Sequence, residues 1–477
     1  MSTTMNLLAF DLGASNGRAI VGKYDGDKIT LKEVHKFTNG AELLHGSSYW
    51  DILKLFSEIK LGLRKAVQCT NNCISSLAID TWGVDYGLLD QAGNLLANPY
   101  HYRDKRTDGL LEEIFTKVSR DEIYGQTGIQ FMQLNTLVQL YADQKYRPWV
   151  LENAEALLFI PDLLNYFLTG QQYNEYTISS TSQLFDPVNS QWAQELFASL
   201  DLPMDIMKTL IFPGETIGGL TSVFRQEMGL SQDIPVIATG SHDTASAVAA
   251  APLTDEHSIY ISSGTWSLLG MELDAPLINE QSLQENFTNE TGVGKKIRFL
   301  KNISGLWLIQ ECKRSWDRAG LNLSYDQISQ AAVLAKPFKC AIDPDDSRFL
   351  NPADMPSAII EYCRETNQPE PHDFGEMARC IYESLAMSYE STLGKLETMI
   401  GRPINTIHMV GGGIQAELLC QFTADTTKRP VVTGPIEATA IGNMLVQLMA
   451  KGEINDLAQG RELVRRSIAL KEYLPNG

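Results

Sequence analysis

The sequence lacks the features of a membrane protein and of a disulfide-stabilised secreted protein. Its 477 residues contain no apolar run of about 18 residues that could span a bilayer, and Asp11 interrupts the amino-terminal apolar stretch before a secretory core could form. The seven cysteines are scattered and odd in number, and they have no partners at zinc-ligand spacing. We therefore expect a cytoplasmic protein with free thiols and no structural zinc.

Basic residues are also scarce. The chain has 39 Lys and Arg against 58 Asp and Glu, which gives a formal net charge of −19. This charge repels nucleic-acid backbones and anionic lipids, so we expect neither as a partner. An anionic ligand would need a local pocket lined by cations, amides or a metal ion. Hydrophobic residues make up 44% and charged residues 20%, which is typical of a globular protein, and the length predicts two or three domains.

The hydrophobic pattern predicts an α/β fold in two related halves. The first half begins with three strands, a helix and a further strand, predicted at residues 7–10, 18–24, 29–37, 50–67 and 74–79. This order predicts a sheet that is mixed rather than wholly parallel. A strand, a small-residue turn and a returning strand recur at residues 258–273. Because an acidic, proline-containing stretch separates the halves, we expect domains over residues 1–250 and 251–477.

Three glycine-containing loops could bind phosphate. The first, residues 11–18, matches neither the P-loop nor the dinucleotide-binding pattern, and alone it could be an ordinary hairpin turn. Its small residues would let backbone amides approach phosphate oxygens, and Asp11 could hold a hydrated divalent ion. Similar loops follow at residues 262–267 and 410–415, the last with three consecutive glycines that packing alone explains poorly. Together the loops favour a bound polyphosphate.

Other segments could bind and activate a polyol. Asp243, between a predicted strand and a small-residue helix, could accept a hydroxyl proton with His242 and Thr244 orienting it, or it could cap the helix. Residues 80–85 and 102–107 mix carboxylates, cations and an aromatic side chain, as sugar sites do, although Trp82 could equally be a core residue. Carboxylates in such segments could also serve glycoside hydrolysis, a reaction that has no use for glycine loops.

Two amides stand near the start of an apolar segment that we expect to be helical. They are Asn302 and Gln310, in the sequence Asn-Ile-Ser-Gly-Leu-Trp-Leu-Ile-Gln. Side-chain amides in such a place could contact a ligand, or they could be helix caps and structural hydrogen bonds.

Taken together, the segments at residues 11–18, 240–247, 263–265 and 411–413 resemble the FGGY carbohydrate kinases, the family that includes glycerol kinase and xylulokinase. The resemblance covers nearly the whole chain. Residues 80–85, 102–107 and 302–307 further resemble the branch of that family that acts on L-rhamnulose. One departure is Ser241, where the family pattern has Asn.

The resemblance implies two actin-like, ribonuclease H-like domains with mixed sheets and a central cleft that holds ATP and Mg²⁺. It implies transfer of the γ-phosphoryl group of ATP to the 1-hydroxyl of L-rhamnulose, in rhamnose catabolism. It also implies that Asp243 is the proton acceptor and that Asp11 is associated with the metal ion. The implied sugar contacts are Gly83, His242, Asp243, Thr244 and Asn302, and the implied nucleotide contacts are Ala14, Ser15, Asn16, Gly17, Arg18, Thr265, Gln310 and Gly412.

Two alternatives remain open at this point. One is a kinase of another ketose, such as L-fuculose. The other is an actin-like ATP-binding assembly protein that phosphorylates no sugar, because a fold of this kind does not fix the function. The oligomeric state leaves no signal in the sequence.

Overall fold

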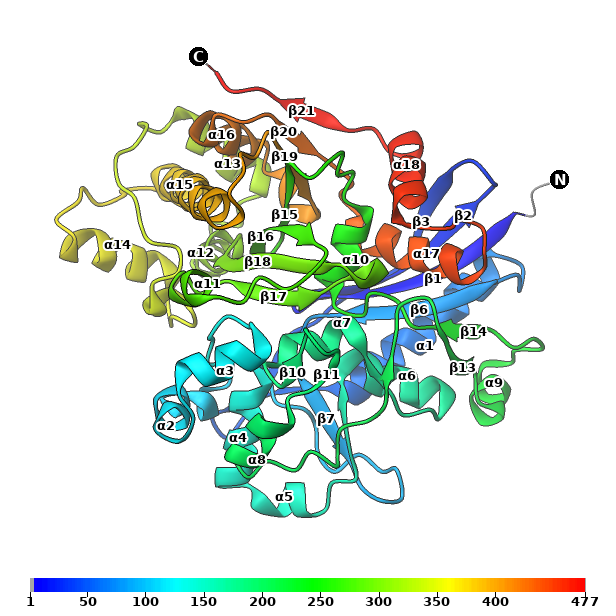
Figure 1. Ribbon diagram of the computed structural model, residues 1–477. Coiled ribbons are helices and arrows are strands. Elements are labelled where there is room, and N and C mark those ends of the chain that lie inside the picture. The colour runs from blue at the N-terminus through cyan, green and yellow to red at the C-terminus, as the bar shows by residue number, and fades with distance from the viewer. Residues whose placement is uncertain (1–3, 477) are drawn as a thin grey trace. The chain divides into compact units, whose positions relative to one another are not determined.

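A computed structural model describes residues 4–476, which divide into two compact units (Figure 1). The first unit contains the chain up to Ala250 together with Glu272–Phe299 and Ala438–Ile468. The second contains Ala251–Met271, Leu300–Glu437 and the chain from Ala469 onward. The first unit therefore takes two segments from the second half of the sequence.

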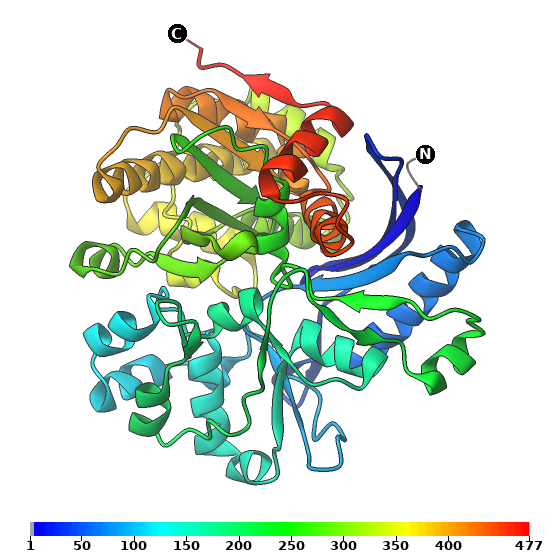
Figure 2. The ribbon, with the colours of Figure 1, turned by 45° about the vertical axis from the view of Figure 1, so that its right-hand side comes forward.

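The first unit is built on a mixed sheet of six strands in the order β13-β14-β6-β1-β2-β3. These strands are β1 (Met5–Leu12), β2 (Asn16–Tyr24), β3 (Ile29–Thr38), β6 (Ser76–Thr81), β13 (Thr216–Gly219) and β14 (Pro235–Ile237). β1 pairs antiparallel with β2 and parallel with β6, so the predicted mixed sheet is confirmed. The dark-blue strands of Figure 2 show the β1–β2–β3 meander. The apolar run of β1 is buried on both faces because this strand lies at the centre.

Helices at both ends of the chain cover this sheet. The predicted early helix is α1 (Ile52–Cys69), which packs against β3 and starts where the Asp51 side chain accepts the Lys54 N–H. α17 (Ala438–Ala450), from the far end of the sequence, packs against β1 and β6. α10 (Asp243–Ala250) and α18 (Leu457–Ser467) pack in turn on α17.

The contact between α10 and α17 is close enough to require glycine. A Cβ atom at Gly442 would lie 1.7 Å from the Ser246 carbonyl oxygen, which is far inside van der Waals contact. The backbones of the two helices therefore approach each other directly at this point.

A mostly helical region with short strands completes the first unit. Its strands are β4 (Ala41–Leu44), β5 (Ser47–Trp50), β7 (Tyr86–Leu89), β8 (Ala156–Phe159), β9 (Asn174–Glu175), β10 (Phe185–Asp186), β11 (Gln191–Trp192), β12 (Leu210–Ile211) and β17 (Thr288–Thr291). Its helices are α2 (Leu110–Lys117), α3 (Arg120–Thr127), α4 (Thr136–Tyr146), α5 (Pro148–Glu152), α6 (Ile160–Thr169), α7 (Tyr176–Ser179), α8 (Gln194–Ser199), α9 (Ser222–Met228) and α11 (Glu280–Gln284). Leu137, Leu140 and Phe159 belong to its apolar core.

The sheet of the second unit repeats the strand pairing seen in the first unit. The strands of this sheet have the order β18-β16-β15-β19-β20-β21 and are β15 (Ser258–Ser263), β16 (Trp266–Leu273), β18 (Ile297–Ser304), β19 (Thr406–Val410), β20 (Val431–Thr433) and β21 (Lys471–Tyr473). β15 pairs antiparallel with β16 and parallel with β19, as β1 does with β2 and β6. This match confirms the internal repeat predicted from the sequence.

Helices of the second unit pack around its sheet. They are α12 (Trp307–Arg318), α13 (Tyr325–Leu334), α14 (Met355–Glu365), α15 (Phe374–Ile400) and α16 (Glu417–Thr427). α15 has 27 residues and ends at Gly401, which adopts a left-handed conformation with φ of 69°. Across residues 4–476, every helix is too short or too polar to serve as a transmembrane segment.

Candidate active site

The loop at residues 11–18 is the tight turn between β1 and β2. The Gly13 N–H donates to the Asn16 carbonyl at 2.9 Å, and the Asn39 side chain donates to the Gly13 carbonyl at 2.9 Å. These bonds hold the turn, and with it the predicted nucleotide residues Ala14, Ser15, Asn16 and Gly17, in a defined shape. A Cβ atom at Gly17 would lie 2.2 Å from the Phe37 ring, so glycine is required there.

Two carboxylates stand side by side at the ends of β1 and β6. Asp11 and Asp80 are partners in the parallel register of these strands. Arg18 Nη2 donates to Asp11 Oδ2 at 2.6 Å, and Asn443 Nδ2 donates to Asp80 Oδ2 at 2.6 Å. Asp80 is fully buried, and its Oδ1 has no hydrogen-bond partner within residues 4–476.

The electrostatics of Asp80 reflect this crowding. Burial raises the pKa of the Asp80 carboxyl well above its ordinary range, and the nearby Asp11 and Asp243 carboxylates raise it further. Three carboxylates therefore act on one another at the ends of these strands. Sequence reasoning assigned Asp80 to the sugar side together with Asp85, whereas its neighbours are Asp11 and Asp243.

The loop at residues 240–247 leads from β14 into α10. The Thr81 N–H donates to the Ser241 carbonyl at 2.9 Å, which ties the loop to the end of β6. Asp243 is the first residue of α10, and the Thr244 hydroxyl donates to its Oδ1 at 3.1 Å. Burial raises the pKa of the Asp243 carboxyl above its ordinary value, and a higher pKa makes a carboxylate a better proton acceptor.

The backbone of this loop rests on two residues that sequence reasoning missed. Glu175 Oε2 accepts the Ser241 N–H at 3.3 Å, and the Thr177 hydroxyl oxygen accepts the His242 N–H at 3.2 Å. Glu175 lies at the end of β9 and also caps α7, so its carboxylate fixes two segments at once. Burial raises the pKa of Glu175 to about 7. The only sequence signal is an acidic residue before a short helix, which is common in caps.

The segment at residues 80–85 forms a buried aromatic cluster. Trp82 is only 6% exposed and packs on Trp50 with ring centroids 4.0 Å apart. Both indole N–H groups donate to Asp85 Oδ2, at 3.0 and 2.6 Å, and burial raises the pKa of Asp85 to about 6. Of the two interpretations of Trp82, core packing is therefore the one that the structure favours. The neighbouring Gly83 has little spare room, since an added Cβ atom would lie 3.2 Å from Thr181.

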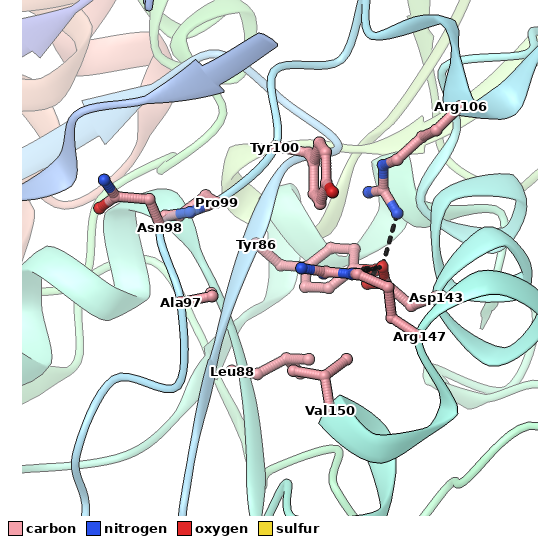
Figure 3. A pocket seen from close by; sticks show the side chains of 11 residues that line it. Tyr86, Leu88, Ala97, Asn98, Pro99, Tyr100, Arg106, Asp143, Arg147 and Val150 are labelled. Carbon is pink, nitrogen blue, oxygen red and sulfur yellow. Dashed lines mark hydrogen bonds and ion pairs between the residues drawn. The ribbon is translucent and has the colours of Figure 1, made fainter. Parts of the chain in front are cut away.

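The cationic segment at residues 102–107 supports this region from a pocket in the first unit (Figure 3). Arg106 Nη1 and Arg147 Nη2 both donate to Asp143 Oδ1, at 2.7 and 2.8 Å. Both guanidinium groups stack on the Tyr100 ring, at 4.1 and 4.5 Å from its centroid. Arg106 is thus engaged in internal contacts while it lines this pocket.

The second unit carries the other predicted nucleotide residues. Thr265 lies in the turn between β15 and β16, and its hydroxyl donates to Gln310 Oε1 on α12 at 3.4 Å. Gly412 follows β19 and is exposed, and a Cβ atom added there would meet nothing within 4 Å.

Packing requires glycine at two of the three positions in the run at residues 411–413. A Cβ atom at Gly411 would lie 2.9 Å from the Ser263 carbonyl oxygen, and one at Gly413 would lie 2.1 Å from the Ser263 hydroxyl oxygen. The expectation that packing explains these glycines poorly is wrong for those two, and it stands for Gly412 alone.

The structure also corrects the position of Asn302. This residue is half-buried in strand β18, not at the start of a helix, and α12 begins only at Trp307. Gly305 lies between the two elements. Glycine is required there because a Cβ atom would lie 2.6 Å from the Trp266 carbonyl carbon. Asn302 and Gln310 therefore belong to different elements.

The chain is similar to known proteins over nearly its whole length. Residues 6–250 match the N-terminal domain of the FGGY family of carbohydrate kinases, and residues 259–451 match its C-terminal domain. The chain belongs to the FGGY family of carbohydrate kinases. A protein named rhamnulokinase from Bacteroides thetaiotaomicron is 47% identical over 98% of this chain and 96% of its own length. Another rhamnulokinase, from Bacillus subtilis, is 40% identical over 98% of this chain and 95% of its own length.

Solved structures agree on the fold of this FGGY kinase. A gluconate kinase from Lactobacillus acidophilus superposes with a TM-score of 0.80 at 16% identity, over 99% of this chain and 94% of that chain. A xylulose kinase from the same organism gives a TM-score of 0.79 at 16% identity, with the same coverage. The predicted α/β class with two actin-like domains and mixed sheets is confirmed. Membership of a family of sugar kinases with ATP as substrate disfavours the alternative of a non-kinase assembly protein.

The acidic residues of the kinase fit a magnesium ion better than a fully protein-enclosed metal site. Within residues 4–476 there is no cluster of three or more His, Cys, Asp or Glu side chains arranged to hold a metal ion. Magnesium in kinases is usually held by one or two carboxylates together with water and substrate phosphates. The Asp80 Oδ1 atom, buried and without a hydrogen-bond partner beside Asp11, matches that requirement.

Proposed function

We infer that this protein transfers the γ-phosphoryl group of ATP to the 1-hydroxyl of L-rhamnulose, giving L-rhamnulose 1-phosphate and ADP, in the breakdown of rhamnose. The observation that carries this inference is sequence identity of 40–47%, over 98% or more of the chain, to curated proteins named rhamnulokinase. Similarity of this extent covers both the phosphate loops and the segments expected to bind sugar.

The proton acceptor in this reaction is Asp243. Its carboxylate is half-buried at the start of α10, partial burial raises its pKa, and the Thr244 hydroxyl and His242 Nε2 both face its Oδ1. We assign the proton of the sugar hydroxyl to the other oxygen, Oδ2. A general base at this point lets the hydroxyl attack phosphorus as its proton leaves.

Sugar recognition is assigned to Gly83, His242, Thr244 and Asn302. Gly83 is assigned on the resemblance to the family, and any contact of this residue with sugar is made by its backbone, since Thr181 lies 3.2 Å from where its Cβ atom would be. His242 and Thr244 flank the base and can donate to sugar hydroxyls. Asn302 contributes an amide from β18.

Nucleotide binding is assigned to the two repeated hairpins and the glycine loop. In the first unit the β1–β2 turn offers the backbone of Ala14, Ser15, Asn16 and Gly17 and the cation of Arg18. In the second unit the contacts are Thr265, Gln310 and Gly412, of which Gly412 presents open backbone. Backbone amides and a cation are the groups that bind phosphate in a protein of net negative charge.

A Mg²⁺ ion is part of the proposal, held by Asp11 with Asp80 beside it. The ion would neutralise charge that develops on the transferring phosphoryl group. Arg18, which donates to Asp11 Oδ2 at 2.6 Å, orients that carboxylate. Asn443 does the same for Asp80 through its 2.6 Å hydrogen bond.

The proposal extends to organisation and location. We assign residues 1–250 to a sugar-binding domain, whose β1–β2 turn also contacts the nucleotide, and residues 251–477 to a nucleotide-binding domain. A cytoplasmic location follows from the use of ATP and agrees with the seven cysteines, all within the described residues and all free thiols. The partner is a small-molecule sugar, and the acidic net charge of −19 disfavours nucleic acid.

An ADP-release assay with a panel of substrates tests the proposed function. L-Rhamnulose and L-fuculose differ in configuration at C4, so only hydroxyl geometry can separate them. One unpaired polar group in the wrong complex costs about 1–3 kcal/mol, so we expect kcat/KM for L-rhamnulose to exceed that for L-fuculose by about tenfold or more. Glycerol should be far slower. Equal values for the two ketoses would refute the assignment of L-rhamnulose, and no activity with any ketose would refute ketose phosphorylation.

A further inference from the structure

The His242 ring lies between the proposed base and a buried ion pair. Its Nε2 atom is 3.6 Å from Asp243 Oδ1. Its Nδ1 atom is 3.1 Å from Arg298 Nη2 and 3.0 Å from Glu290 Oε2. Arg298 Nη2 and Glu290 Oε2 are themselves 2.9 Å apart. One nitrogen of the ring therefore faces the reacting groups, and the other faces two charges on β17 and β18.

The Arg298 guanidinium is held rigidly. The residue is 0% exposed, and its Nε donates to the Thr291 carbonyl at 3.1 Å. β17 and β18 are joined by a turn in which the Gly292 N–H donates to the Lys296 carbonyl at 2.7 Å, so Glu290 and Arg298 stand on the two arms of one hairpin. Burial acts to raise the pKa of Glu290, but the interactions with Arg298 and His242 outweigh burial and hold this pKa at about 2. The pair therefore stays charged near neutral pH.

The chemistry of arginine determines where the imidazole proton lies. A guanidinium only donates hydrogen bonds, so its bond to His242 requires that Nδ1 accept. In a neutral imidazole with an accepting Nδ1, the proton is on Nε2. The Nε2–H group then faces Asp243, where it can donate to the carboxylate or to a sugar hydroxyl. The opposite tautomer would direct a lone pair toward that carboxylate.

Glu290 makes this arrangement depend on Arg298. The Glu290 carboxylate already lies 3.0 Å from Nδ1, and without the guanidinium it would accept a hydrogen bond from a protonated Nδ1. The proton would then leave Nε2. A neutral ring cannot hold a proton on both nitrogens, so loss of Arg298 would invert the direction of the hydrogen bond on the substrate side.

We propose that Arg298 is a positioning residue, which fixes the His242 tautomer with Nε2–H directed at Asp243 and the sugar. The proposal rests on the assignment of Asp243 and His242 to the sugar site. It gives a buried charge pair a role in the reaction that stability alone does not require, because a buried ion pair is in general no more stabilising than apolar residues of similar size.

A spectroscopic test reads the tautomer directly. Nitrogen NMR of the full chain labelled at histidine distinguishes a protonated from an accepting ring nitrogen, and loss of a signal in His242→Asn assigns the resonance. We expect Nε2–H in the wild type, Nδ1–H in Arg298→Met, and retention of Nε2–H in Arg298→Lys, whose ammonium can still donate. Because no sugar is present, this readout holds even if the preferred ketose proves to be a different one. A bare Nε2 in the wild type, or an unchanged signal in Arg298→Met, would overturn the proposal.

Kinetics supply the second test. Arg298→Met should lower kcat/KM for L-rhamnulose by about tenfold or more, because a hydrogen bond to a charged group is lost. The KM for ATP should stay within a few-fold of the wild type, and Arg298→Lys should recover most of the loss. Arg379→Met is the matched control. Arg379 Nε pairs with Glu383 at 2.8 Å and Nη1 donates to the Ala332 carbonyl at 3.2 Å, both within the second unit.

A double variant keeps the proposal testable if Arg298→Met alone fails to fold. Arg298→Met leaves Glu290 as an unpaired buried charge, whereas Arg298→Met with Glu290→Leu removes both charges and leaves an apolar pair. This double variant should fold, lose the fixed tautomer and remain slow with L-rhamnulose. If it folds and matches Arg379→Met in kcat/KM for L-rhamnulose, Arg298 has only a structural role and the proposal fails.

Discussion

Replacement of Asp243 by Asn separates the chemical role of this residue from its structural one. The Asn side chain has the same shape and keeps an oxygen that can accept the Thr244 hydroxyl, which donates to Oδ1 at 3.1 Å in the wild type. Only the basic oxygen is lost. A general base contributes about 10² to 10⁴ in rate, which corresponds to about 3–5 kcal/mol in the activation free energy, so kcat should fall by that factor.

The stability of the same variant should change in the opposite direction. Burial raises the pKa of Asp243, and the Asp11 carboxylate raises it further, so the ionised form is costly in the folded state. Removing the charge relieves that cost. We therefore expect Asp243→Asn to unfold at a temperature equal to or above that of the wild type, as is common for residues kept for function at the expense of stability.

The measurement combines ADP release with L-rhamnulose, equilibrium binding of ATP and thermal unfolding. The expected pattern is a large loss of kcat with ATP affinity and unfolding temperature preserved. Turnover within a few-fold of the wild type would show that Asp243 is not the base. A joint collapse of ATP affinity and stability would instead indicate that its carboxylate is needed for the structure of α10.

Three further predictions follow from other parts of the structure. Asp11→Ala should lower kcat and raise the Mg²⁺ concentration for half-maximal activity by about tenfold or more, and an unchanged magnesium titration would remove Asp11 from the metal site. Burial raises the pKa of Glu175 to about 7, above its value in the unfolded chain, so its contribution to stability is fully present below about pH 4.5 and is lost as the pH rises through 7. Relative to Glu175→Gln, urea unfolding of the wild type should thus lose on the order of 3 kcal/mol across that window, and parallel pH profiles would contradict the assignment. Gly442→Ala should destabilise the protein by about 1–3 kcal/mol or more because its Cβ would lie 1.7 Å from the Ser246 oxygen, whereas Gly394→Ala, a helical glycine with open space, should be neutral or stabilising in the same thermal scan.

Local patterns predicted the elements that carry the phosphate loops. The apolar run before Asp11, the small-residue turn after it and the returning strand follow the rules for a hairpin, and β1 and β2 have those positions. Helical spacing likewise predicted α1 to within a few residues. Such predictions succeed because periodicity and turn chemistry act between residues that are close in sequence.

Contacts between distant segments could not be predicted in this way. Asn443 donates to Asp80 across 363 positions of sequence, and Arg298 meets His242 across 56. Neither pairing leaves a periodic or spacing signal, because each depends on how strands and helices pack in three dimensions. The same holds for Trp82, whose indole could have faced a ligand but instead packs on Trp50. Sequence motifs therefore predict candidate reactive groups, but they carry no signal for the side chains that contact those groups.

In the proposed mechanism, the repeated hairpin gives one backbone arrangement two chemical roles. Asp11 and Ser262 each stand one residue before the end of the first strand of their hairpins, and each pairs with the parallel strand that follows, Asp11 with Asp80 and Ser262 with Val410. Amides of a tight turn suffice to bind phosphate, and a carboxylate there would repel it. A carboxylate is useful only where a cation is bound as well. The hairpin that carries Asp11 therefore suits a metal-bearing site, and the hairpin that carries Ser262 suits direct contact with an anion.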